Sequence, residues 1–162
     1  MALWEQGHPI AGSAAETYLR SRGITIDGPP SLRFHEKLQH GPTESSYPAL
    51  LGLITDSVSA KPIGLHRTFL TLDGTGKAPV EHAKMMLGRA HGGVVRLGEV
   101  TDQLMVAEGI ETALSVQQAC SVPVWAALSA SGLKSLNIPP GITTVTIMAD
   151  GDDKGEEAAL AA

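Results

Sequence analysis

Two apolar runs decide the fold of this chain, and each ends in acidic residues and glycine. The first reads Leu104-Met-Val-Ala-Glu-Gly-Ile-Glu111, and the second reads Thr144-Val-Thr-Ile-Met-Ala-Asp-Gly-Asp-Asp153. An apolar run that stops at a turn signal is typical of a buried parallel strand. In open α/β sheets, ligands bind at the carboxyl ends of such strands. We therefore expect functional residues at the ends of both runs.

Three carboxylates are the candidate metal ligands. Glu108 follows the first run, and Asp150 and Asp152 follow the second, about 42 residues later. If the strand geometry continues through Gly151, the two aspartates point the same way, because side chains alternate along a strand. Carboxylates gathered at one sheet edge repel one another unless a hard cation such as Mg²⁺ neutralises them. The residues alone thus predict a metal-dependent phosphoryl-transfer site, although each acidic motif taken singly is equally typical of a solvated helix cap.

Length and composition favour one ordinary domain, or one domain with a small appendage. The chain has 162 residues, 43% of them hydrophobic and 4% aromatic, so its core is built mainly from aliphatic side chains. The single cysteine, Cys120, excludes an internal disulfide framework and a cysteine-based zinc site, and we expect it to pack on a helix. No run has the length of a membrane span and no signal peptide is evident, which makes a cytoplasmic protein with no membrane partner the expectation.

Charge divides the chain unevenly. Residues 1–98 hold ten basic and eight acidic residues, whereas residues 99–162 hold two basic and nine acidic residues. An acidic half beside a mildly basic half suits a metal site next to a phosphate-binding surface, but random variation of a surface explains it as well. The change in pattern places a boundary there: 1–98 as an α+β subdomain and 99–162 as an α/β core.

The expected elements follow from local patterns. Ser13 and Glu16 form a capping box for a helix over 12–23, which Gly23 ends. Strands are predicted at 31–36, 49–55, 63–72, 93–97, 103–107, 122–128 and 143–149, a helix at 110–120, and a short helix or turn at 130–136. The chain ends soon after the last strand, so we expect an incomplete core whose parent protein continues.

Basic residues and a glycine-rich segment are weaker candidates. Arg67, Lys84 and Arg89 are interspersed with apolar residues, and either ordinary surface charge or contacts to nucleic-acid or nucleotide phosphates explains them. Gly74-Thr-Gly-Lys77 is similar to part of a phosphate-binding P-loop. Thr71 stands where the first glycine of that motif belongs, however, and residue 78 is Ala instead of Ser or Thr. A hairpin turn is therefore the interpretation of this segment.

The two acidic motifs, in this order and with α/β alternation between them, resemble the Toprim domain. That domain is shared by bacterial-type primases, type IA and type II topoisomerases, recombination-mediator proteins and some nucleases. The segments Ile63–Leu70, Ala83–Gly88 and Gly93–Leu97, and the helix around Tyr18, resemble primase-like Toprim proteins of phages, plasmids and mobile elements. The resemblance implies an α/β fold: a Toprim-like core with a mainly parallel sheet flanked by helices, preceded by a small α+β subdomain.

The resemblance also implies roles for individual residues. Glu108 would be the general acid/base or a metal ligand, and Asp150 and Asp152 would hold Mg²⁺ or Mn²⁺. Glu111 and Asp153 would support this metal site indirectly. The resemblance further implies that Arg67, Lys84 and Arg89 help to hold template and nucleotides.

The implied function is primer synthesis from nucleoside triphosphates on single-stranded DNA, with a fused or associated helicase as a possible partner. A Toprim nuclease or topoisomerase-like cleavage module and a non-catalytic nucleic-acid-binding adaptor are the alternatives. Strand passage needs a nucleophilic tyrosine, and Tyr18 and Tyr47 lack a recognisable setting for that role. The sequence leaves open the template preference, the oligomeric state and whether this chain is active by itself.

Overall fold

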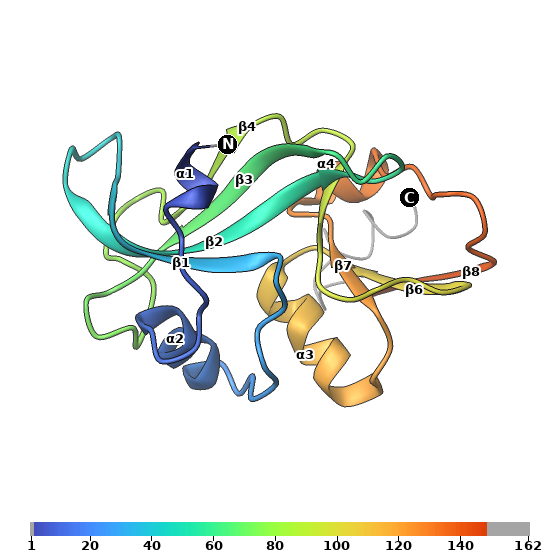
Figure 1. Cartoon of the computed structure of the whole chain (residues 1–162), viewed down its shortest axis with the longest axis horizontal. Helices are drawn as coiled ribbons and strands as arrows, with labels where there is room; N and C mark the ends of the chain where they lie inside the picture. Colours follow the sequence, from blue (N-terminus) through green and yellow to red (C-terminus); the bar gives the residue numbers. More distant parts are fainter. Residues whose placement is uncertain (1, 149–162) are drawn as a thin grey trace. The chain divides into compact units, whose positions relative to one another are not determined.

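The computed structural model describes residues 2–148, which form two compact units (Figure 1). The first unit comprises Met1–Leu53 and Leu65–Leu87, and the second comprises Ile54–Gly64 and Gly88–Ala162. Asp150, Asp152 and Asp153 lie outside the described residues. The elements in chain order are α1 (Ala2–Glu5), α2 (Ala14–Ser21), β1 (Leu32–Gln39), β2 (Ser46–Asp56), β3 (Pro62–Phe69), β4 (Lys84–Gly88), β5 (Gly93–Arg96), β6 (Gln103–Ala107), α3 (Ile110–Cys120), β7 (Val124–Ala126), α4 (Ala130–Lys134) and β8 (Thr144–Met148).

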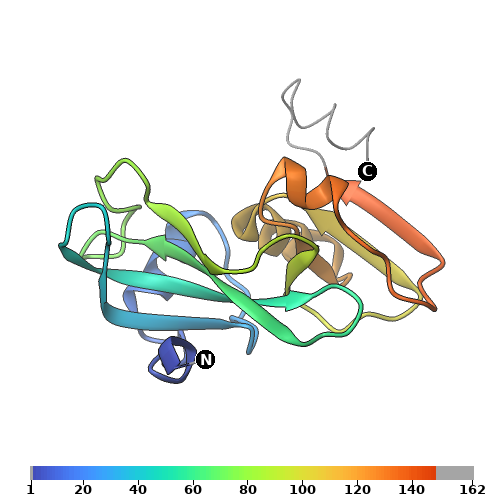
Figure 2. The ribbon, with the colours of Figure 1, turned by 90° about the horizontal axis from the view of Figure 1, so that it is seen from above.

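The first unit is built on a hairpin of β1 and β2, with β3 and β4 continuing the sheet from β2 (Figures 1 and 2). Ala49 and Leu51 on β2 and Leu65 and Phe69 on β3 project into one apolar cluster, because alternate residues of a strand share a face. The cluster also contains Trp4 of α1, which is why so short a helix is held in place.

The helix α2 begins where its capping residues predict. The Ser13 hydroxyl accepts a hydrogen bond from the backbone N–H of Ala15, and Gly23 follows the helix with a φ of 78°. The Glu16 carboxylate accepts from the N–H of Gly12, one residue earlier than a regular capping box requires.

The second unit contains the parallel part of the sheet. β6 pairs in parallel with β7 on one side and with β8 on the other, and β5 joins the outer edge of β7 in the antiparallel direction. This mixed α/β arrangement, with parallel central strands and flanking helices, agrees with the predicted α/β core.

Helices cover both faces of the parallel strands. Leu104, Val106 and Trp125 form a cluster with Leu133 of α4, whereas α3 buries Ile110, Ala113 and Leu114 against the opposite face of β6 and β7 (Figure 1). Alternation along each strand supplies apolar side chains to both faces, as buried parallel strands require. One expectation is wrong: Cys120 is exposed at the end of α3 and does not pack.

Candidate functional site

The candidate site is at the carboxyl ends of β6 and β8. The parallel register pairs Gln103 with Thr144 and Ala107 with Met148. Ala107 directly precedes Glu108, and Met148 precedes Asp150 by two positions in the sequence. The prediction that two distant strands end side by side is confirmed as far as Met148. The full ligand set of Glu108, Asp150 and Asp152 stays a prediction.

The backbone at Glu108 is fixed by the neighbouring strand. Its carbonyl accepts a hydrogen bond of 2.7 Å from the N–H of Leu128, and the Ala107 carbonyl accepts one of 2.9 Å from the N–H of Ala127. Gly109 then caps α3 with extended backbone (φ −102°, ψ 156°). Glu108 is therefore held at the point where the chain leaves the sheet and enters the helix.

The Glu108 side chain suits a divalent cation. It is half-buried, and within residues 2–148 its carboxylate makes no hydrogen bond or ion pair. A carboxylate that has no partner among these residues is available to coordinate a cation. Carboxylate oxygens are also the ligands that Mg²⁺ prefers. Among the described residues no three acidic, histidine or cysteine side chains form a metal-binding group. Within residues 2–148, the argument for a divalent cation therefore depends on Glu108.

Glu111 lies in the first turn of α3 and is half-exposed. A carboxylate there interacts favourably with the helix dipole. Its side chain does not complete a metal-binding group with the other described residues.

A strained turn beside Glu108 was not predicted from the sequence. Leu128 has a φ of 72°, a left-handed conformation that is costly for a residue with a branched side chain. Gly132 packs so closely on this turn that a Cβ there would lie 1.9 Å from the Ala127 carbonyl oxygen. Ser129 caps α4 by accepting from the N–H of Gly132 at 3.0 Å. The Ser-Ala-Ser-Gly segment was the available signal, since serine is a preferred cap.

Arg67 is a half-buried cation on β3 in the first unit. One of its terminal nitrogens donates to the Met86 carbonyl at 3.1 Å, and the guanidinium lies 5.8 Å from the centre of the Phe69 ring. Its Nε is buried and makes no hydrogen bond to a described residue. Desolvation lowers the pKa of this guanidinium from its usual value. The stem packs on the sheet, as the surface-charge interpretation requires, while part of the charge is left unpaired.

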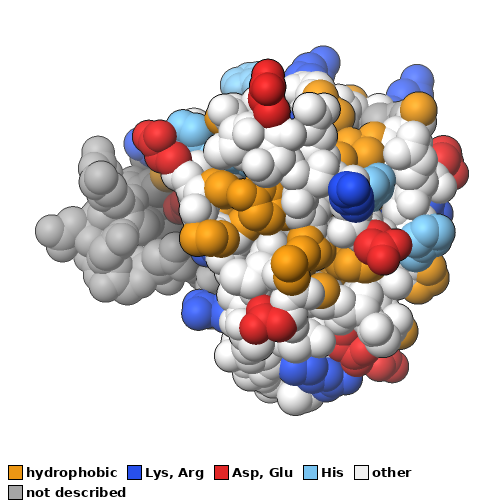
Figure 3. Space-filling model, turned by 90° about the vertical axis from the view of Figure 1, so that its left-hand side faces the viewer, with side chains coloured by type: hydrophobic (Ala, Val, Ile, Leu, Met, Phe, Trp, Pro, Cys, Tyr) orange, Lys and Arg blue, Asp and Glu red, His pale blue; other side chains and the backbone are white. Residues whose placement is uncertain are grey.

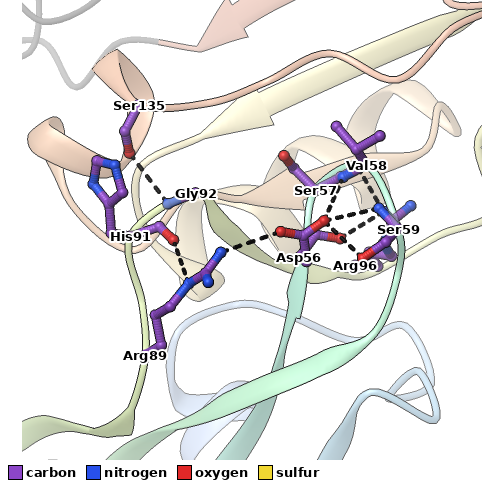
Figure 4. Close-up of polar contacts among 9 residues, drawn as sticks. All are labelled: Asp56, Ser57, Val58, Ser59, Arg89, His91, Gly92, Arg96 and Ser135. Carbon is purple, nitrogen blue, oxygen red and sulfur yellow. Dashed lines mark hydrogen bonds and ion pairs between the residues drawn. The ribbon is translucent and has the colours of Figure 1, made fainter.

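Lys84 and Arg89 differ in their surroundings. Lys84 is exposed at the start of β4. Arg89, in the second unit, lies 3.4 Å from a carboxylate oxygen of Asp56 and donates from Nε to the His91 carbonyl (Figure 4). Arg67 and Lys84 belong to the first unit and Arg89 to the second, and their assignment as phosphate ligands stays a prediction.

The Asp56 turn joins several segments of the second unit (Figure 4). The Asp56 carboxylate accepts from the N–H groups of Val58 and Ser59 and from the Ser59 hydroxyl. The Ser59 N–H and hydroxyl lower the pKa of this carboxyl most, and the Arg89 charge adds a smaller effect. Asp56 is therefore ionised at neutral pH and holds the turn between β2 and β3.

Arg96 is a structural cation that sequence reasoning missed. It donates from Nε to the Thr55 hydroxyl at 3.1 Å and from a terminal nitrogen to the Ser57 carbonyl at 2.7 Å. The guanidinium also lies 4.0 Å from the centre of the buried Trp125 ring. No sequence signal links these residues, because they come from three separate segments.

The fold and the paired strand ends define a Toprim-type α/β protein, and the Toprim domain family matches residues 103–162. Over residues 1–97 the chain belongs to the family described as a domain of unknown function (DUF7146). No curated protein matches the chain.

One similar solved structure is described as the structure of the DnaG catalytic core. It superimposes with a TM-score of 0.57 at 16% sequence identity and covers 98% of this chain. This chain spans 63% of the length of that structure. The likeness shows a shared fold.

No helix within residues 2–148 is long and apolar enough to span a lipid bilayer.

Proposed function

We propose that this chain is the phosphoryl-transfer module of a primase-like protein, and that it synthesises primers from nucleoside triphosphates on single-stranded DNA in the cytoplasm. The observation that carries the proposal is the parallel register of β6 and β8, which places the residue before Glu108 beside Met148. The fold shared with the DnaG catalytic core and the matched Toprim family support it.

In this proposal, Glu108, Asp150 and Asp152 hold Mg²⁺ or Mn²⁺, and Glu111 and Asp153 support them. The bound metal would neutralise charge that develops on the transferred phosphate. The chain's own contribution is to fix the backbone of Glu108 through the Leu128 hydrogen bond and to place the carboxylate at the edge of the sheet. We further propose that residues 1–98 form the nucleic-acid-binding subdomain, in which Arg67, Lys84 and Arg89 contact phosphates.

Metal binding by the chain itself tests the first step. We expect Mg²⁺ or Mn²⁺ to raise the melting temperature, because a ligand that binds only the folded state stabilises it, by about 2.7 kcal/mol at a hundredfold excess over Kd. Glu108→Gln, Asp150→Asn and Asp152→Asn should each reduce this rise. Glu81→Gln is the matched control, because the Glu81 side chain is 90% exposed. An equal metal response in all four variants would contradict the ligand assignment.

Nucleotide incorporation and strand cleavage, measured on one single-stranded template with the same metals, separate the three candidate functions. The protein should incorporate nucleotides into new primers, and Glu108→Gln should lower the rate by at least about 100-fold, the range expected for loss of a general acid or base. Cleavage without incorporation would indicate the nuclease alternative. Template binding without either reaction would indicate the adaptor.

A further inference from the structure

The Lys and Arg side chains of the second unit are gathered on three segments. Four of them belong to its described residues: Lys61 (segment 56–61), Arg89 and Arg96 (segment 89–96) and Lys134 (segment 130–135). Five acidic residues are described in the same unit: Asp56, Glu99, Asp102, Glu108 and Glu111. Only Asp56 lies on the three segments. The positive charge of this unit is therefore concentrated in one part of its chain.

Hydrogen bonds make the three segments neighbours. The N–H of Ser57 donates to the Gly92 carbonyl at 3.0 Å, and the N–H of Gly92 donates to the Ser135 hydroxyl at 3.4 Å (Figure 4). His91 directly precedes Gly92, and Lys134 directly precedes Ser135. We use the name basic patch for the exposed cations and the histidine on these segments: Lys61, Arg89, His91 and Lys134.

Most of the charge of the basic patch is unpaired. Within residues 2–148 the side chains of Lys61, His91 and Lys134 make no hydrogen bond or ion pair. Arg89 pairs with Asp56 at 3.4 Å, but its side chain is 63% exposed, and ion pairs at such positions are weak. The patch thus holds the three positive charges of its Lys and Arg residues against one carboxylate.

The fold does not require these lysines. A cation at the carboxyl end of a helix, such as Lys134 in α4, is favourable where the last carbonyl groups lack partners. In α4 the carbonyl groups of Ser131, Gly132 and Leu133 already accept from the N–H of the residue that follows the helix. Lys61 contacts no other side chain of its turn. Both ammonium groups are consequently available to a ligand.

Strand register places the basic patch at the same edge of the sheet as Glu108. One row of paired residues crosses five strands, from β2 through β5, β7 and β6 to β8: Ile54, Val95, Ala126, Ala107 and Met148. Asp56 lies two residues beyond this row on β2, and Glu108 lies one residue beyond it after β6. Because neighbouring strands are about 4.8 Å apart, the end of β2 lies about 14 Å from the end of β6 along this edge.

We propose that the basic patch binds the phosphate backbone of the nucleic-acid strand on which the proposed metal centre acts. This inference rests on the proposed function, because it takes Glu108 as part of that centre. Ammonium and guanidinium groups contact phosphates without reading the base sequence. Cations spread over three segments suit a strand, whose phosphates follow one another at intervals, whereas a single phosphate group requires donors that converge on one point.

Fluorescence anisotropy tests the proposal, with a labelled oligothymidylate titrated with the whole chain in the presence of EDTA. We expect Lys61→Ala and Lys134→Ala each to weaken binding by about fivefold, as loss of one exposed charge contact would. Each substitution should also reduce the slope of log K against log salt by about 0.7, because one contact to a single-stranded phosphate is lost. Lys37→Ala, which removes an exposed lysine of β1 in the first unit, should bind like the unaltered chain.

Failure of the oligonucleotide to bind, or equal weakening by Lys37→Ala, would overturn the proposal. Tripolyphosphate, added as a competitor, represents the phosphates of a free nucleotide. If it binds more tightly than the oligonucleotide and loses affinity in the same two variants, the assignment to a strand is wrong.

The metal response separates this inference from the proposed function. Lys61→Ala and Lys134→Ala should keep the rise in melting temperature that Mg²⁺ or Mn²⁺ produces, so a failed metal centre and a failed basic patch give different results. The melting temperatures without metal also show whether each variant is folded.

Discussion

Close packing at single residues fixes the turn beside the candidate metal centre. The nearest approach is at Gly132, where a Cβ would lie 1.9 Å from the Ala127 carbonyl oxygen. Because this contact is with backbone, a larger residue can be accommodated only by moving α4 away from the end of β7. The identity of this residue is therefore set by the space available to it.

Gly132→Ala should lower the free energy of unfolding by about 2–3 kcal/mol, as overpacking of a tight contact does. Gly41→Ala is the control, because a Cβ there meets no atom within 4 Å and the backbone has no positive φ. Urea unfolding of the two variants measures the difference. A Gly132→Ala chain as stable as the Gly41→Ala chain would show that α4 moves freely.

Two features of single residues were not predicted from the sequence. Cys120 was expected to pack on a helix because free cysteine is usually buried, but it lies at the last position of α3 on the exposed side. No local pattern indicated that Arg89 pairs with Asp56, 33 positions away in the sequence. The exposure of Cys120 and the Asp56–Arg89 pair both depend on which side of an element faces the neighbouring segments.

Secondary-structure elements of this chain were predictable where local signals are complete. β6 spans Gln103–Ala107 and α3 spans Ile110–Cys120, matching the predicted ranges 103–107 and 110–120. An apolar run, a Glu-Gly turn and a helical spacing follow one another there without interruption. The predicted helix over 12–23 is shorter, Ala14–Ser21, because residues before Ser13 are turns.

Two elements were missed for lack of such signals. α1 has four residues and depends on burial of Trp4. In β4 the apolar and polar residues alternate too weakly to predict a strand, and most of its residues are exposed. Its strand conformation comes from pairing with β3, as shown by the hydrogen bond from the N–H of Phe69 to the Ala83 carbonyl.

The cap of α2 provides a test at this scale. Ser13→Ala removes the hydroxyl that accepts from the Ala15 N–H and donates to the Ile10 carbonyl. We expect the free energy of unfolding to fall by about 1 kcal/mol. Ser115→Ala on the exposed side of α3 is the control and should change stability by less than about 0.5 kcal/mol. Equal denaturant midpoints for the two variants would contradict the capping role.

At the scale of the molecule, acidic groups on the surface favour the folded state near neutral pH. The pKa values of Glu16, Asp56 and Asp73 are all lowered by hydrogen bonds to their carboxylates. Asp73 is exposed and Glu16 and Asp56 are partly exposed, so the effect of each on stability is small and is weakened by salt. Figure 3 shows one face of the molecule, with single charged side chains scattered among small apolar patches.

The pH dependence of stability follows in sign from these shifts. A carboxyl whose folded pKa is lowered binds its proton less tightly in the folded state, so its contribution is present above the unfolded pKa of about 4 and is lost as the pH falls through the folded value. Denaturant midpoints should therefore decrease below about pH 4. Asp56→Asn should make this decrease of the denaturant midpoint shallower. If the midpoint of the variant falls as steeply below pH 4 as that of the unaltered chain, the turn around Asp56 does not contribute to the pH dependence.

The sequence by itself determined the α/β class, the position of Glu108 at the end of a strand and the cap of α2, because these depend on neighbouring residues and on periodicity. Only the tertiary structure decided that β6 lies between β7 and β8, that Leu128 fixes the backbone of Glu108 and that the segments of the basic patch are neighbours. These contacts join segments separated by about 20 to 45 positions. Their geometry is set by strand register and side-chain packing, which local patterns do not specify.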